Sequence, residues 1–214
     1  RYSTPVGARA RAIIASPEAV SNIVPWGIPE ELYNFEDEVV LKYGSGPDGT
    51  SYSGNFQALG IDQPGGNEYR SNIIEGAETL LRINDWVDTQ TGNLVGPTTQ
   101  GAGTRIFDQP NGELDLFGTL TRDYPGGNEL AIPDSQFIIV PLIEELVDAQ
   151  GHTEVQILGF ACIIITEIRD MQNDPEYGNG VAIIGQFVSR ALVNSDGSVV
   201  AAGTNDLRVV RLIK

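Results

Sequence analysis

The hydrophobic and polar positions of the first 25 residues differ from those of the rest of the chain. Apolar side chains recur at every second position from Val6 to Ile14, and Arg9 and Arg11 fall on the other face. This period is typical of a strand with one narrow apolar side, although a short helix is an alternative. Because prolines divide and close this segment, the sequence predicts an N-terminal arm over residues 1–25 and a β-rich globular domain over residues 26–214.

The remaining pattern predicts about eight to ten short strands separated by turns rich in Gly and Pro. Residues 153–169 are apolar on both alternating faces, which is typical of a central strand covered on both sides. Residues 68–81 instead have apolar positions at helical spacing, interrupted by Gly76. We therefore expect a mainly β domain of the β-sandwich or jelly-roll type, with one short helix and an extended arm.

One turn is written almost identically twice, as DQPGGNE at 62–68 and as DYPGGNE at 123–129. Pro presets φ, the following Gly accepts positive φ, and Asp bonds back to the backbone, so this sequence bends the chain by itself. Turn chemistry is the favoured explanation of the repetition. The alternative is that the acidic side chains of the two turns bind calcium through their oxygens. These candidate ligands are Asp62, Glu68, Asp123 and Glu129.

Composition and charge exclude several classes of function. The net charge of −16 repels the phosphate backbone of nucleic acids, and it suits a soluble secreted protein. The longest apolar stretch, residues 157–165, is too short to span a bilayer. No nucleic-acid partner and no membrane-spanning segment are therefore expected.

Residues able to perform catalysis are few. His152 lies in a polar turn and Cys162 in an apolar run, so we expect a surface imidazole and a buried thiol. A carbohydrate-active enzyme remains an alternative because the acidic loops carry aromatic residues, but Trp26 and Trp86 are more typical of packed positions. The sequence predicts no enzymatic activity and no cofactor, apart from calcium as a candidate.

Lysine is rare in this chain, and Lys42 is one of two. Its place inside a regular strand usually indicates an outward-facing charge. A second hypothesis is an intramolecular isopeptide bond, in which a buried, deprotonated Lys42 amine attacks an Asn or Asp side chain while a nearby carboxylate shuttles protons.

Three stretches resemble one bacterial family. IVPWGIPEELYNFEDEVVLKYG, GNFQALGIDQPGGNEYRSNIIEG and INDWVDTQTGNLVGPTTQG are similar to the Flp pilus-assembly TadE/TadG-like proteins, particularly the Gram-positive forms. The resemblance covers residues 23–190 and implies a mainly β extracytoplasmic domain associated with surface appendages, with no enzymatic residues. Members usually begin with a membrane-anchoring helix, and this sequence departs from that pattern because no such helix precedes Arg1.

The arm and the resemblance together predict an extracellular, cell-surface structural protein that forms a homopolymer, a filament or pilus-like appendage, by strand donation. The arm would add a strand to the edge of an identical subunit. A monomeric, envelope-associated accessory or binding module, stabilised by calcium, is the alternative, and in that case the arm packs on its own domain. The predicted donor positions are Val6, Ala8, Ala10, Ala12 and Ile14.

Overall fold

The computed structural model describes residues 11–32, 38–43, 55–107, 118–119, 134–145, 152–174, 178–187, 190–193, 199–200 and 207–213. The chain begins with β1 (Arg11–Pro17), β2 (Ala19–Val20), β3 (Ile28–Pro29), η1 (Glu30–Leu32), β4 (Glu38–Lys42) and β5 (Asn55–Leu59). Its middle holds α1 (Gly66–Glu75), β6 (Leu81–Arg82), β7 (Trp86–Thr91), α2 (Val95–Phe107), β8 (Gly118–Thr119) and η3 (Asp134–Gln136). The last elements are β9 (Phe137–Ile143), β10 (Glu154–Asp174), β11 (Gly178–Phe187), β12 (Arg190–Val193), β13 (Val199–Val200) and β14 (Leu207–Ile213).

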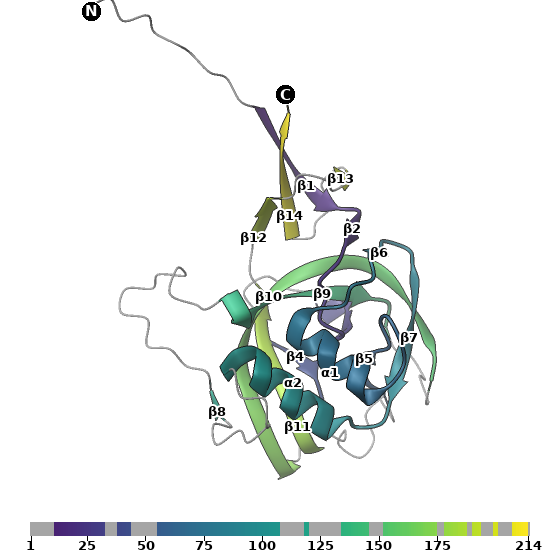
Figure 1. The fold of residues 1–214 in the computed structure, drawn as a ribbon, viewed down its shortest axis with the longest axis vertical. Helices are drawn as coiled ribbons and strands as arrows, with labels where there is room; N and C mark the ends of the chain where they lie inside the picture. Colours follow the sequence, from purple (N-terminus) through teal and green to yellow (C-terminus); the bar gives the residue numbers. More distant parts are fainter. Residues whose placement is uncertain are drawn as a thin grey trace, which may run out of the picture.

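The body of the molecule is built on one eight-stranded sheet among the described strands. Its main path runs β3-β9-β10-β11-β4, and β5, β7 and β8 join it from the side. The 21-residue β10 is the central strand, since it pairs with β7, β8, β9 and β11 along different parts of its length. Figure 1 shows β10 curving around the two α-helices, so the sheet and the helices enclose a common core.

Strand β10 buries both of its faces, as the sequence predicted. Odd-numbered residues before the irregularity and even-numbered residues after it lie on the same face of the strand. Val155 and Ile157 pack in the same cluster as Phe160 and Cys162, and a register irregularity lies between Ile157 and Gly159. A bulge adds one residue and therefore reverses the alternation of side chains beyond it. A single apolar run can thus serve two cores.

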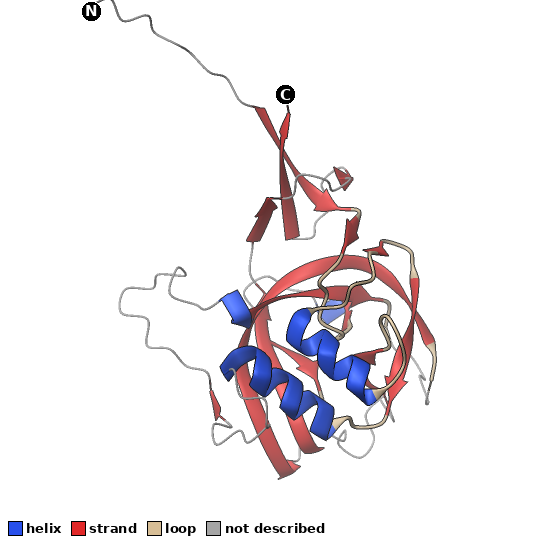
Figure 2. Cartoon of the chain, viewed as in Figure 1, coloured by secondary structure: helices blue, strands red, loops and turns tan. Residues whose placement is uncertain are grey.

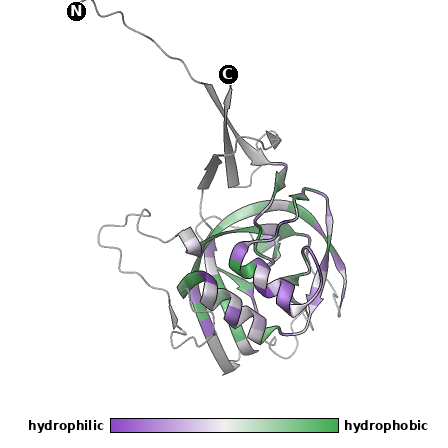
Figure 3. Cartoon of the chain, in the orientation of Figure 1, coloured by the Kyte–Doolittle hydropathy of each residue, from purple (hydrophilic) through white to green (hydrophobic). Residues whose placement is uncertain are grey.

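Helices α1 and α2 form the layer that covers the sheet (Figure 2). Tyr69 and Ile73 of α1 and Ala102 of α2 are buried in the larger cluster with residues of β9, β10 and β11. The helices approach closely at Gly101, where an added Cβ would lie 2.9 Å from the Cβ of Ile73. In Figure 3 the hydrophobic colour follows much of β10, whereas hydrophilic positions mark the outer side of α1.

The mainly β prediction is confirmed, but the expectation of one short helix was wrong. The structure contains two α-helices in the described part of the chain, and α2 was not predicted. Its sequence includes Pro97 and the glycines at 96, 101 and 103, which lower helix propensity and interrupt the apolar spacing. Pro97 is tolerated because it lies in the first turn of the helix, where backbone N–H groups have no partner within the helix.

The N-terminal segment divides at Glu18. Before it, β1 pairs antiparallel with β14, and the two form a ribbon that extends out of the body (Figure 1). This ribbon is the centre of a four-stranded sheet with the order β12-β14-β1-β13. After Glu18, β2 pairs with β6, and Ile23 and Val24 are fully buried. Val20, Ile23 and Val24, which the sequence assigned to the arm, are therefore core residues of the body.

Candidate functional site

Lys42 is the largest charged side chain that is fully buried among the described residues. It ends β4, and its Nζ donates to the carbonyl of Tyr43 at 2.6 Å, to Oδ1 of Asn93 at 3.3 Å and to the carbonyl of Val181 at 3.4 Å. Burial lowers the pKa of Lys42 to about 7, because an apolar interior disfavours the charged form. Near neutral pH a large share of the amine is therefore uncharged.

A bulge in β4 turns Lys42 inward. In the pairing with β11, Lys42 lies opposite Ile183 and Val40 opposite Ile184, so Leu41 is the extra residue between them. Leu41 and Lys42 are consequently both buried, although simple alternation would place them on opposite faces. The usual explanation for Lys42, an outward-facing charge, is therefore wrong, and the buried lysine of the second hypothesis is present.

The Asn93 side chain is held between Lys42 and Gly180. Asn93 lies between β7 and α2, flanked by Gly92 and Leu94, both of which have positive φ. Gly180 also has positive φ, and a Cβ added there would lie 3.0 Å from Nδ2 of Asn93. The glycine therefore gives the carboxamide room to lie beside the amine. No carboxylate is buried with them in the described part of the chain, so the predicted proton shuttle is not found there.

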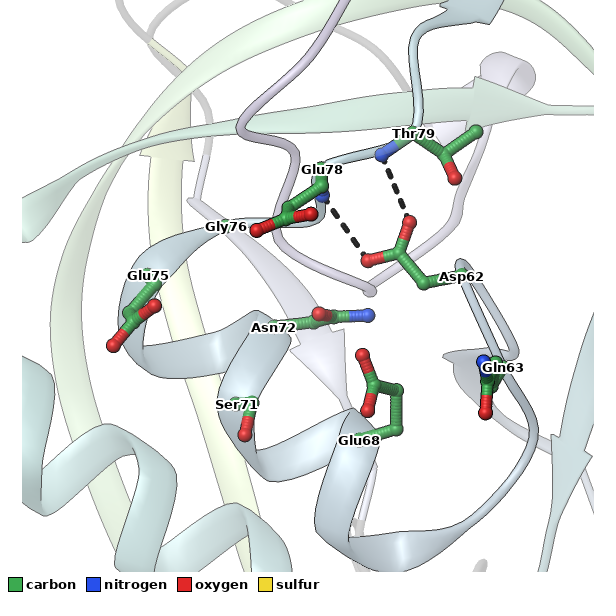
Figure 4. Close-up of a pocket in the computed structure, with 9 residues that line it drawn as sticks. All are labelled: Asp62, Gln63, Glu68, Ser71, Asn72, Glu75, Gly76, Glu78 and Thr79. Atoms are coloured by element: carbon green, nitrogen blue, oxygen red, sulfur yellow. Dashed lines mark hydrogen bonds between the residues drawn. The ribbon is translucent and has the colours of Figure 1, made fainter.

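The second candidate site is an acidic pocket of about 460 Å³ that lies along α1 (Figure 4). The loop before the helix contributes Asp62, and the helix contributes Glu68 and Glu75. The segment after the helix contributes Glu78 and Thr79. Four carboxyl groups thus line one hollow, and their negative charges repel one another.

Asp62 has a clear structural role in this pocket. It has a positive φ of 65°, and its two carboxylate oxygens accept the backbone N–H groups of Glu78 at 3.1 Å and Thr79 at 2.8 Å. Partial burial alone would raise the pKa of Asp62, but hydrogen bonds from Thr79, Glu78 and Asn72 outweigh it and lower the pKa below its ordinary value of 3.8. The carboxylate thereby ties the turn before α1 to the chain after it.

The structure brings together two of the four predicted calcium ligands. Asp62 and Glu68 line the same pocket, whereas Asp123 and Glu129 lie outside the described residues. Over the described ranges, no three His, Cys, Asp or Glu side chains are grouped so that they can hold a metal ion. Calcium binding at Asp62 and Glu68 therefore stays a prediction.

The predicted donor segment has a partner within its own chain. Ala12 lies opposite Leu212 and Ile14 opposite Val210 in the antiparallel β1–β14 ribbon. The other predicted positions, Val6, Ala8 and Ala10, lie outside the described residues. Donation to a second chain would therefore require β1 to exchange its partner.

Sequence reasoning missed a buried hydrogen-bond chain between three distant segments. Nε1 of Trp26 donates to the hydroxyl of Tyr69 at 2.8 Å, and this hydroxyl lies 3.5 Å from Oγ1 of Thr98. Burial raises the pKa of Tyr69, so its hydroxyl stays protonated. The three residues come from three of the stretches that carry the family resemblance, but pattern analysis of single segments cannot reveal contacts between them.

Arg105 was also missed, and it ties α2 to the end of α1. Its guanidinium donates to the carbonyls of Ile73 and Ile74, each at 3.0 Å, and of Ser135 and Phe137. The carbonyls in the last turn of a helix accept no hydrogen bond from the helix itself, so a cationic side chain can donate to them. Burial lowers the pKa of Arg105, although arginine remains charged.

The other residues considered for chemistry lie as follows. Cys162 is a buried free thiol, as predicted. His152 is exposed, with Nδ1 2.9 Å from the carbonyl of Thr89 and Nε2 3.3 Å from Oδ1 of Asp88, which confirms a surface imidazole. Trp26 is fully buried, but Trp86 is 56% exposed, so the packed position expected for Trp86 was wrong.

Comparisons with family models, curated proteins and solved structures gave no significant match to this chain. Within the described ranges, neither α-helix nor any other helix has the length and apolar character needed to cross a bilayer.

Proposed function

We propose that this chain is a non-enzymatic structural subunit of an extracellular surface assembly, and that subunits join by exchanging β1. The observation that carries the proposal is the β1–β14 ribbon, in which Arg11–Ala15 pair with Val209–Ile213 outside the body. The ribbon leads directly into the body, where Val20, Ile23 and Val24 are buried. The proposed place at the cell surface rests on the resemblance of the quoted sequence stretches to TadE/TadG-like proteins, which no family model or curated match supports.

β1 can pair with β14 equally well within one chain and between two chains. The β14 strand of a neighbouring chain offers β1 the same register and the same side chains as the β14 strand of its own chain. Exchange of an identical element therefore costs mainly the entropy of association, which high local concentration reduces. Reciprocal exchange closes a dimer, whereas exchange from one subunit to the next gives an open filament.

The test uses two differently tagged full-length chains in a Cys162→Ala background. One chain carries Ala12→Cys and the other carries Leu212→Cys, because these positions face each other across the ribbon. The chains are co-expressed, oxidised and separated without reductant. We expect a disulfide-linked species containing both tags, since only an exchanged β1 brings the two cysteines together.

Two controls make the result interpretable. A single chain with both substitutions should form an internal disulfide, which shows that the pair has suitable geometry. Pairing Ala12→Cys with Val209→Cys, the partner of Ala15, should give no cross-chain product because the register is wrong. Internal disulfides without any cross-chain product, together with a monomeric mass by sedimentation, would refute strand exchange.

That outcome would favour the second candidate, a monomeric envelope-associated accessory module. The pairing of β1 with β14 of the same chain supports this function, because the backbone of β1 is then hydrogen-bonded without a second subunit. The acidic pocket at Asp62 and Glu68 would then be the place to look for calcium. A rise in melting temperature that calcium produces and magnesium does not, reversed by a chelator, would support this function.

A further inference from the structure

The contact between Lys42 and Asn93 joins two segments that lie 51 positions apart in the chain. We propose that these side chains form an intramolecular amide bond, an isopeptide crosslink between β4 and the segment that leads into α2. This crosslink does not depend on exchange of β1, because both residues lie in the body.

The geometry holds the reacting groups together before any bond forms. Nζ of Lys42 donates a hydrogen bond to Oδ1 of Asn93 at 3.3 Å, so the amine and the carboxamide are in direct contact. The carbonyls of Tyr43 and Val181 orient the amine, and Gly180 leaves space for the carboxamide. Lys42 is therefore held by the buried end of β4, and Asn93 approaches it from the half-buried loop between β7 and α2.

The surroundings also favour the nucleophilic form of the amine. Lys42 is fully buried, and this burial brings its pKa to about 7. A desolvated lysine is a known kind of activated nucleophile, because the neutral amine keeps a free electron pair. An exposed lysine, in contrast, is almost entirely protonated at neutral pH.

The reaction is balanced without an oxidant or a co-reactant. The electron pair of Nζ forms a bond to Cγ of Asn93, and the bond from Cγ to Nδ2 breaks. One proton moves from Nζ to Nδ2, which leaves as ammonia. The product is a secondary amide, and the chain loses the mass of one ammonia.

The reaction can be slow and still go to completion, because each molecule reacts only once. Well-oriented intramolecular reactions reach effective molarities on the order of 10⁵ M or more. No carboxylate is buried beside the pair in the described part of the chain, so rapid proton shuttling is not expected. We therefore expect the bond to form over time after folding.

Intact mass spectrometry of the unfolded full-length chain tests the proposal directly. After ageing of the folded protein at pH 8, we expect a mass lower by one ammonia than the sequence predicts. Proteolysis should release a branched peptide that joins Lys42 to Asn93. A time course from freshly refolded protein should show conversion from the full mass to the reduced mass.

Three variants exclude other sources of ammonia loss. Asparagine can also lose ammonia by forming a succinimide, but that product would persist in Lys42→Arg and in Asn93→Ala. The crosslink should be absent from both. In Asn93→Asp, the same attack would release water instead of ammonia. Circular dichroism should show that all three variants retain the β-rich fold.

An unchanged mass in aged, folded wild-type protein would overturn the proposal. Lys42 would then be a buried amine whose role is limited to hydrogen bonds with Tyr43, Asn93 and Val181. A crosslink from Lys42 to a different residue, identified in the branched peptide, would also overturn the assignment of Asn93.

Discussion

Lys42 and Asp62 are both ionisable groups held by backbone atoms, yet they lie in opposite surroundings. Lys42 is fully buried, and desolvation drives its pKa toward neutrality. Asp62 lies at the edge of an open pocket, and hydrogen bonds to its carboxylate lower its pKa. The comparison shows that burial favours the neutral form of a group, whereas hydrogen bonds to the charged form favour the charged form.

The largest expected effect comes from breaking the proposed bond. Asn93→Ala should lower the free energy of unfolding by about 4 kcal/mol, the scale of a disulfide that closes a loop of comparable length. Urea denaturation of wild type, Lys42→Met, Asn93→Ala and the double variant measures this loss. A covalent bond predicts that each single variant is destabilised nearly as much as the double variant. Additive losses would contradict a shared bond.

The next effect concerns alkaline pH in a chain that cannot form the bond. In Asn93→Ala, Lys42 should keep its lowered pKa, so the unfolded state binds more protons than the folded state between about pH 7 and the ordinary value of 10.5. The free energy of unfolding should therefore rise with pH in this range, by up to about 1.4 kcal/mol per unit.

Two controls sharpen this alkaline test. The crosslinked wild type should lack the rise, because an amide nitrogen does not titrate. Asn93→Ala combined with Lys42→Met should also lack it, since no amine remains at this position. Denaturation at pH 7.5, 8.5 and 9.5 measures the slopes, and equal slopes in all three proteins would argue against Lys42 as the titrating group.

The contribution of Asp62 to stability should depend on pH in the acidic range. Asp62→Ala should lower the free energy of unfolding by about 1 kcal/mol at pH 7, because two backbone N–H groups lose their acceptor. The folded pKa lies below 3.8, so this stabilisation is present above that value and is lost as pH falls through the folded pKa.

Thermal melts between pH 2 and 7 measure the difference between wild type and Asp62→Ala. The difference should shrink toward the acid end. Glu75→Gln is the matched control, since it removes a carboxylate of the same pocket without touching these two hydrogen bonds. A control that behaves like Asp62→Ala would assign the effect to charge alone.

The sequence predicted those features that arise within one segment. The two apolar faces of β10, the start of the first helix and the burial of Cys162 follow from local periodicity. The inward turn of Lys42 depends on a bulge against β11, and its contact with Asn93 joins residues 51 positions apart. Such contacts arise from packing between elements, which no single segment encodes.

The glycines explain why α2 was missed. Gly101 lowers helix propensity, but it also lets α2 approach Ile73 of α1 closely. The close packing of α2 on α1 that Gly101 permits stabilises the helix more than the low helix propensity of glycine destabilises it. The Pro-Gly-Gly turn shows a similar dependence, because it leads into α1 while its Asp62 bonds to the chain that follows the helix.

The smallest expected effect is the response of the acidic pocket to divalent cations. Calcium and magnesium should raise the melting temperature slightly and equally, because either ion screens the repulsion among Asp62, Glu68, Glu75 and Glu78. Both oxygens of Asp62 already accept hydrogen bonds, so tight calcium coordination would have to replace them. Glu68→Gln should weaken the response to both ions. A rise that only calcium produces, and that Glu68→Gln removes, would instead establish Asp62 and Glu68 as members of a calcium site, and the contrast with Lys42 would then be between two chemically active sites.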